Sequence, residues 1–241
     1  RVVFMTPLTT YADYTLAAAD RILRIPDGVT DEIAASVLLK GMTARALLKA
    51  ARQTRPGDTI VWHAAAGGGG QIATQWAAHL GARVIGIVGS EAKVAVAKAN
   101  GCADVIVSPP ADIAKTVRAL TNGEGAQAVY DSVGKATFEA SLDCLAPLGL
   151  LAVFGASSGP PPPLPLQTLA AKGSLFVTRP TVFTYTRTPA LLKETADDLF
   201  AAIADGVVKI APPTRYRLED AAQAHRDLEG RKTTGSLVLI P

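Results

Sequence analysis

The residue pattern with the clearest chemical meaning is a glycine turn between an apolar run and an alanine-rich run. The segment Thr59–Trp62 is followed by Ala64–Gly70, which reads AAAGGGG, and then by the pattern Gln71–Ala78. This order predicts a strand, a turn and a helix. A glycine turn lets the backbone approach a pyrophosphate, and the helix N-terminus offers free amides, so the pattern indicates a dinucleotide cofactor. The alternative is a flexible loop without a ligand, because a glycine-rich turn alone is weak evidence.

The end of the next predicted strand bears on which dinucleotide is bound. An NAD site carries Asp or Glu there, about 20 residues after the glycines. This chain has Val88, Gly89 and Ser90 at that place, followed by Lys93. A hydroxyl and a cation suit a 2′-phosphate, so the sequence favours NADP. In the alternative interpretation Lys93 is an ordinary surface residue and Ser90 only a helix N-cap, while Glu91 would bind a ribose hydroxyl if it pointed inward.

Several other functional classes lack their patterns in this chain. No Gly-Lys-Ser/Thr follows the glycines, which argues against a nucleoside-triphosphatase loop. Neither the cysteines, Cys102 and Cys144, nor the histidines, His63, His79 and His225, have metal-ligand spacing, so no metal site is expected. The same cysteine usage fits a reducing cytosol. The net charge of +3 is scattered and no apolar run approaches a membrane span, so neither nucleic acid nor membrane is an expected partner.

The middle of the chain alternates predicted strands and helices. The expected strands are Thr59–Ala64, Val84–Val88, Ala103–Val107, Ala128–Asp131, Leu150–Phe154 and Leu175–Thr178, and the expected helices are Gln71–Leu80, Glu91–Asn100, Asp112–Leu120, Ala136–Leu145 and Leu191–Ile203. Near-continuous apolar strands that alternate with helices predict an α/β fold, a Rossmann doubly wound parallel sheet.

The two ends of the chain differ from the middle. Residues near 1–37 and 207–241 carry short strands, turns and prolines, with a helix expected at Glu219–Leu228 and a strand at Ser236–Ile240. Together they form the expected remainder of a second domain that residues 38–206 interrupt. The chain starts in mid-strand, so we expect its first part to be absent, with N-terminal processing as the alternative. Pro160–Pro163 predicts a stiff connecting loop, or alternatively a short recognition motif.

Several motifs together resemble a known family. They are Leu39–Thr43, His63–Gly70, Tyr130–Gly134, Phe154–Gly159, Val177–Pro180 and Thr233–Gly235. In this order they resemble the zinc-free quinone oxidoreductases of the medium-chain dehydrogenase superfamily, over essentially the whole chain. The resemblance implies an NADPH-dependent reductase of quinones or related electron-poor carbonyl compounds, with a GroES-like catalytic domain whose N-terminal part is absent here. Together with the cysteine usage, the expected location is cytoplasmic. It also implies a homodimer formed through the edge strand near Leu175–Thr178.

The resemblance also assigns residues to parts of the cofactor. Gly68 and Gly69 would meet the pyrophosphate, and Gly89, Ser90, Lys93 and Arg231 the 2′-phosphate. The residues lining the ribose and nicotinamide would be Thr43, Val133, Gly155, Ser157, Pro180, Thr181 and Val182. Two positions depart from the family pattern: Gly69 replaces a common Val, which implies a more mobile turn, and Ser108 replaces a tyrosine that stacks beside the adenine ribose. In the alternative interpretation, Arg231 is an ordinary solvated residue of the C-terminal tail and does not contact the cofactor.

The expected reaction is hydride transfer from the nicotinamide, with the protein supplying position and electrostatics. No catalytic proton donor is identified. Thr43 orients nicotinamide or substrate, or alternatively only caps or packs, and His63 is expected to be structural. Two rival functions remain open: an enone or 2-alkenal reductase on the same fold, and a cofactor-binding protein without turnover, acting structurally or in RNA binding.

Overall fold

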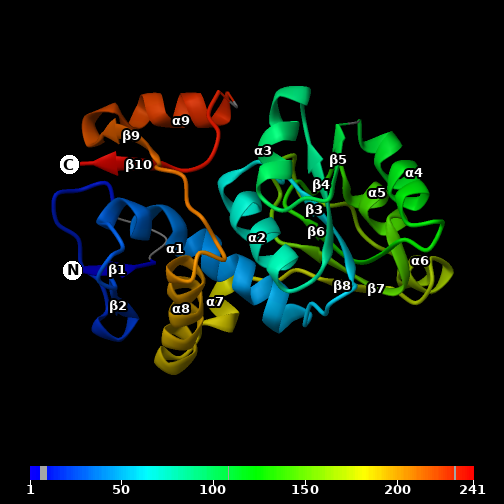
Figure 1. Ribbon diagram of the computed structural model, residues 1–241, viewed down its shortest axis with the longest axis horizontal. Helices are drawn as coiled ribbons and strands as arrows, with labels where there is room; N and C mark the ends of the chain where they lie inside the picture. The colour runs from blue at the N-terminus through cyan, green and yellow to red at the C-terminus, as the bar shows by residue number, and fades with distance from the viewer. Residues whose placement is uncertain (6–9, 108, 231) are drawn as a thin grey trace.

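The computed structural model describes residues 1–5, 10–107, 109–230 and 232–241. Its centre is a six-stranded parallel sheet with the strand order β5-β4-β3-β6-β7-β8 (Figure 1). The strands are β3 (Thr59–His63), β4 (Arg83–Val88), β5 (Asp104–Val107), β6 (Ala126–Asp131), β7 (Leu145–Val153) and β8 (Phe176–Thr178). From β3 the chain adds β4 and β5 toward one edge of the sheet, and from β6 it adds β7 and β8 toward the other edge. The boundary between β3 and β6 is therefore the switch point of a doubly wound sheet. The predicted fold class is confirmed.

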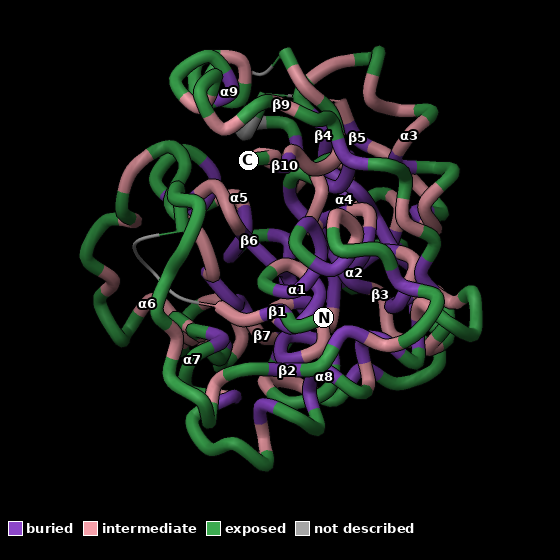
Figure 2. The backbone as a smooth tube through the Cα atoms, turned by 90° about the vertical axis from the view of Figure 1, so that its left-hand side faces the viewer, coloured by how far each residue is buried: buried purple, intermediate pink, exposed green. Residues whose placement is uncertain are grey.

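Helices cover both faces of this sheet, which is why its strands are mainly apolar. In β3, Ile60 and Trp62 belong to one hydrophobic cluster and Val61 to another, since neighbouring side chains point to opposite faces. The first cluster packs against α1 (Asp31–Arg45), α2 (Gly68–His79) and α8 (Pro189–Ala204), and the second against α4 (Pro110–Leu120) and α5 (Phe138–Asp143). Figure 2 shows buried residues concentrated along the central strands.

A smaller part of the molecule holds both termini (Figure 1). It contains an antiparallel pair, β1 (Val2–Phe4) with β2 (Ile22–Arg24), and a parallel pair, β9 (Thr214–Arg217) with β10 (Leu237–Ile240). The remaining elements are α3 (Val94–Ala99), α6 (Leu166–Ala171), α7 (Val182–Tyr185), α9 (Ala221–Glu229), a π-helical turn at Ala46–Ala51, and short 3₁₀ turns at Ala19–Arg21, Glu91–Lys93 and Leu218–Asp220.

Helix α1 connects the two parts, and the sequence patterns did not identify it. It contacts β1 and β10 on one side and α2 and α8 on the other. The sequence feature that marks its start is the N-cap residue Thr30, whose side chain accepts a hydrogen bond from the Ile33 amide. Two acidic residues follow in the first turn. The domain boundary proposed between residues 37 and 38 falls inside this helix.

One predicted element is wrong at its end. The sequence predicts a helix through Leu145, but α5 ends at Asp143 and Leu145 is the first residue of β7, where it pairs with Ala126. The register then shifts, and Leu148 has a φ of 60° within the same strand. Residues 154–165 form no helix or strand, as predicted for the proline-rich loop.

Candidate functional site

Most of the predicted cofactor-binding residues follow directly after the carboxyl ends of parallel strands. The strands β3, β4, β6, β7 and β8 all end at the same edge of the sheet, where doubly wound folds bind their ligands. The residues brought to this edge are Gly68 and Gly69 after β3, Gly89, Ser90 and Lys93 after β4, Val133 after β6, Gly155 and Ser157 after β7, and Pro180, Thr181 and Val182 after β8. Arg231 and Ser108 lie outside the described residues.

The glycine turn is shorter than the sequence suggests, because the helix begins within the glycines. The turn is closed by a hydrogen bond from the Gly67 amide to the Ala64 carbonyl (2.9 Å), and α2 starts at Gly68. Amides in the first turn of a helix lack partners within the helix, and no side chain caps this end. Gly69 therefore lies in the first turn of α2 and not in a loop before it.

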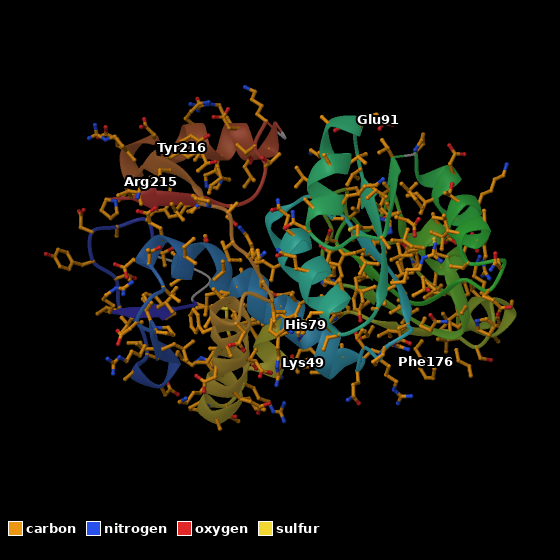
Figure 3. The ribbon with its side chains drawn as sticks, viewed as in Figure 1. Lys49, His79, Glu91, Phe176, Arg215 and Tyr216 are labelled. Atoms are coloured by element: carbon orange, nitrogen blue, oxygen red, sulfur yellow. The ribbon has the colours of Figure 1, made fainter. Side chains whose placement is uncertain are left out.

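The end of β4 is open and carries a lysine side chain. A Cβ added at Gly89 would meet nothing within 4 Å. Ser90 is the N-cap residue of the 3₁₀ turn Glu91–Lys93, but its side chain makes no capping hydrogen bond. Lys93 is half-buried, and within the described residues its ammonium has no hydrogen-bond or ion-pair partner. Glu91 is exposed at the start of the next helical turn (Figure 3), where it lines a surface hollow together with Lys98.

The loop after β6 is held by Asp131, whose role the sequence did not reveal. This carboxylate is fully buried and accepts four hydrogen bonds. One oxygen accepts from the Val133 amide (2.7 Å) and the Gly134 amide (3.0 Å), and the other from the hydroxyls of Thr137 (2.7 Å) and Ser141 (2.8 Å). The position of the predicted nicotinamide-lining residue Val133 is therefore fixed by a buried side chain. An Asp side chain that accepts from the amide two residues later forms an Asx turn. The Asp at position 131, directly before the loop, is the sequence feature that could have predicted this role.

His63 extends this network to the end of β3. Its Nε2 lies 3.0 Å from the Ser141 hydroxyl, and that hydroxyl donates to Asp131. Ser141 therefore accepts from a protonated Nε2. Burial lowers the pKa of His63, while the nearby Asp131 opposes this shift. The side chain links the glycine turn to the loop after β6, in agreement with the structural role expected for it.

The loops after β6 and β7 pack against each other through residues that the sequence analysis had partly missed. A Cβ added at Gly155 would lie 2.4 Å from the Ser132 carbonyl oxygen, so only glycine permits this approach. The Ser158 hydroxyl donates to the Val133 carbonyl (2.7 Å) and accepts from the Ala136 amide (2.9 Å). Ser157, the predicted residue, is exposed. Both serines are exposed, and Ser158 differs from Ser157 in that its hydroxyl joins the two loops.

The remaining predicted residues differ in which of their groups a ligand could contact. The Thr43 hydroxyl donates to the Leu39 carbonyl (2.7 Å) within α1, which leaves its oxygen free to accept. Thr181 is exposed, whereas the Val182 side chain is buried in the core. Val182 therefore offers only its backbone to a ligand.

The described residues hold neither a metal-binding cluster nor a membrane-spanning helix. No group of three or more His, Cys, Asp or Glu side chains is placed to hold a metal ion. No helix in this part of the chain is both long enough and apolar enough to cross a membrane.

Comparisons with known proteins give the same relatives by sequence and by structure. Residues 68–197 match the family model described as zinc-binding dehydrogenase. The chain is 46% identical to the quinone oxidoreductase of Pseudomonas aeruginosa over 242 aligned positions, covering 100% of this chain and 74% of the relative. It is 40% identical to the 2-haloacrylate reductase of a Burkholderia species, covering 98% of this chain and 72% of that protein.

The solved structures agree with these matches. The Escherichia coli quinone oxidoreductase, whose structure is complexed with NADPH, superposes with a TM-score of 0.95 at 41% identity, covering 100% of this chain and 75% of that one. The sheet order, the carboxyl-edge loops and these relatives agree, and the chain therefore belongs to the quinone oxidoreductases of the medium-chain dehydrogenase/reductase superfamily.

Proposed function

We propose that the protein reduces quinones by hydride transfer from NADPH. The observation that carries the proposal is the end of β4, where Gly89 and Ser90 take the place of the carboxylate of an NAD site. The half-buried Lys93 ammonium, which has no partner among the described residues, follows three residues later. The relatives that are quinone oxidoreductases, one of them solved with NADPH, support it.

The described residues fit a dinucleotide. Uncapped first-turn amides at α2 offer hydrogen bonds to a pyrophosphate, and the open space at Gly89 leaves room beside Ser90 and Lys93 for a 2′-phosphate. When bound, NADPH supplies the hydride. The chain's own part is to hold the loop of Val133 rigid through Asp131 and to fix Gly155 against it.

The chain needs no proton donor of its own for a quinone, because the reduced oxygens can take protons from water. The alternative substrate class is an electron-poor alkene, and the 40% identity to a 2-haloacrylate reductase favours it. A panel of quinones and enones, assayed with NADPH, separates the two. If neither substrate class is turned over, the remaining function is cofactor binding without catalysis.

Parallel fluorescence titrations with NADPH and NADH test the cofactor assignment. We expect NADPH to bind about tenfold or more tightly, because a charged hydrogen bond to the 2′-phosphate contributes about 1.5–3 kcal/mol. Lys93→Met should remove this preference and leave NADH binding unchanged. Lys98→Met, which changes an exposed lysine of α3, is the control. Equal affinity of the unaltered protein for both cofactors would contradict the proposal.

We also infer that the protein is a homodimer paired through β8. This strand is at the edge of the sheet. Two exposed apolar side chains lie there, Phe176 on β8 (59% exposed) and Leu148 on the neighbouring β7 (67%). Figure 3 labels Phe176 at this edge. Unpaired edges with apolar side chains favour association. Sedimentation should give a dimer that Phe176→Glu dissociates, and a monomer before substitution would refute this inference.

A cytoplasmic location is part of the proposal. Cys102 and Cys144 are both free and buried, which suits a reducing compartment. Cell fractionation tests this, and recovery outside the cytoplasm would overturn it.

A further inference from the structure

Lys40 is a half-buried lysine of α1 that none of the assignments above explains. Its ammonium donates a hydrogen bond to the Ser236 hydroxyl (2.9 Å), which comes from the C-terminal segment. Among the described residues this hydroxyl is its one hydrogen-bond partner, and no carboxylate there lies within ion-pair distance. An ammonium has three donors and carries a full charge, so a single neutral partner leaves it poorly compensated.

The lysine lies beside the first turn of α2. A Cβ added at Gly69 would be 3.9 Å from the Lys40 Cβ, and a Cβ added at Gly68 would be 2.8 Å from the Ser236 hydroxyl that Lys40 binds. The Ser236 hydroxyl that Lys40 binds therefore lies at the start of the helix, beside the Gly235 carbonyl oxygen, which is 2.9 Å from the same added Cβ. Thr43 follows three residues later on α1, and residues with this spacing share a helix face.

This arrangement is electrostatically unfavourable as it stands. The N-terminus of α2 carries the positive end of the helix dipole, and a cation in the same place adds charge of the same sign. Burial lowers the pKa of the Lys40 ammonium, because desolvation disfavours its charged form. An anion between the helix end and the lysine would relieve both costs, since it would pair with the ammonium and accept from the first-turn amides.

We propose that Lys40 is a further cofactor-binding residue, whose ammonium pairs with the pyrophosphate of the dinucleotide at the first turn of α2. This inference rests on the proposed function. It assigns to Lys40 the part of the cofactor that NADPH and NADH share, whereas Lys93 is assigned to the 2′-phosphate that only NADPH carries. Ser236 holds the lysine in place until the pyrophosphate replaces or joins it.

The test is a set of titrations of the protein with NADPH, NADH and adenosine 2′-monophosphate, which has the 2′-phosphate but no pyrophosphate. Lys40→Met should weaken the binding of NADPH and of NADH by the same factor, about tenfold or more. The ratio of these two affinities and the affinity for adenosine 2′-monophosphate should stay unchanged. Lys40→Arg keeps the charge and should restore most of the binding. Lys115→Met, at an exposed lysine of α4 on the other face of the sheet, is the matched control.

Ser236→Ala separates binding from a merely structural role. It removes the same Lys40–Ser236 hydrogen bond as Lys40→Met does. If that bond were the whole function of Lys40, both substitutions would weaken dinucleotide binding equally, and the proposal would be wrong. We expect Ser236→Ala to change either affinity less than twofold. An altered NADPH/NADH ratio in Lys40→Met would also overturn the assignment. If Lys40→Met does not fold, Lys40→Gln takes its place. Failure of the unaltered protein to bind either dinucleotide would instead reject the proposed function, and this inference with it.

Discussion

Gly70→Ala should destabilise the protein and abolish dinucleotide binding, although it adds only one methyl group. A Cβ at this position would lie 2.4 Å from the Ala64 carbonyl oxygen and 2.6 Å from that of Ala65. Both obstacles are backbone atoms of the glycine turn, so no side chain can rotate away. We expect a loss of at least about 1–3 kcal/mol in the free energy of unfolding, the usual cost of overpacking, measured by urea denaturation.

The neighbouring glycine provides the control for this prediction. A Cβ at Gly69 would meet only the Lys40 Cβ, at the ordinary contact distance of 3.9 Å. Gly69→Ala should therefore stabilise the protein by about 0.5–1 kcal/mol, because alanine loses less backbone entropy in a helix than glycine. If both substitutions destabilised the protein equally, flexibility rather than close packing would explain the glycines.

Asp131→Ala should cost about 3 kcal/mol or more of stability. The substitution leaves two amides and two hydroxyls without their acceptor in a fully buried place. Each unpaired buried donor costs about 1–3 kcal/mol, and the hydroxyls of Thr137 and Ser141 recover part of this by turning to other acceptors. Because the same carboxylate positions Val133, NADPH affinity should fall as well. Chemical denaturation and fluorescence titration measure the two effects.

Two further variants make this prediction specific. Asp131→Asn keeps an oxygen for the Val133 and Gly134 amides but presents a donor to the two hydroxyls, so its stability should lie between those of the native protein and Asp131→Ala. Asp143→Ala removes an exposed carboxylate of α5 that pairs with Lys172, and it should cost less than about 1 kcal/mol. Equal losses at positions 131 and 143 would refute the importance of the buried network.

The sequence predicted those parts of the fold that depend on local patterns. Apolar strands separated by helical runs, with glycines after β3 and β4, were sufficient to predict a parallel sheet and the edge at which a cofactor binds. The error at Leu145 has a physical cause, because this residue continues an apolar helical pattern but pairs with Ala126 in the sheet. Tertiary pairing overrode the local preference.

The parts that could not be predicted depend on contacts between distant residues. His63 and Ser141 are 78 positions apart, and Lys40 and Ser236 are 196 apart. Neither pair has a spacing that a pattern search can recognise, since only the folded sheet and α1 bring them together. The domain boundary proposed at residues 37 and 38 rests on a change of composition along the chain, whereas α1 spans these residues and packs on both parts.

The continuity of α1 limits how such proteins can be recombined. A gene fusion that exchanged the nucleotide-binding unit at residue 38 would take Met42 and Ala44 of the buried face of α1 and leave Ala34 and Val37 behind. Each half would then carry an apolar surface with no partner. An exchangeable module must include the whole helix from its Thr30 cap, so the natural crossover point lies in the turn at Pro26–Val29, before the helix begins.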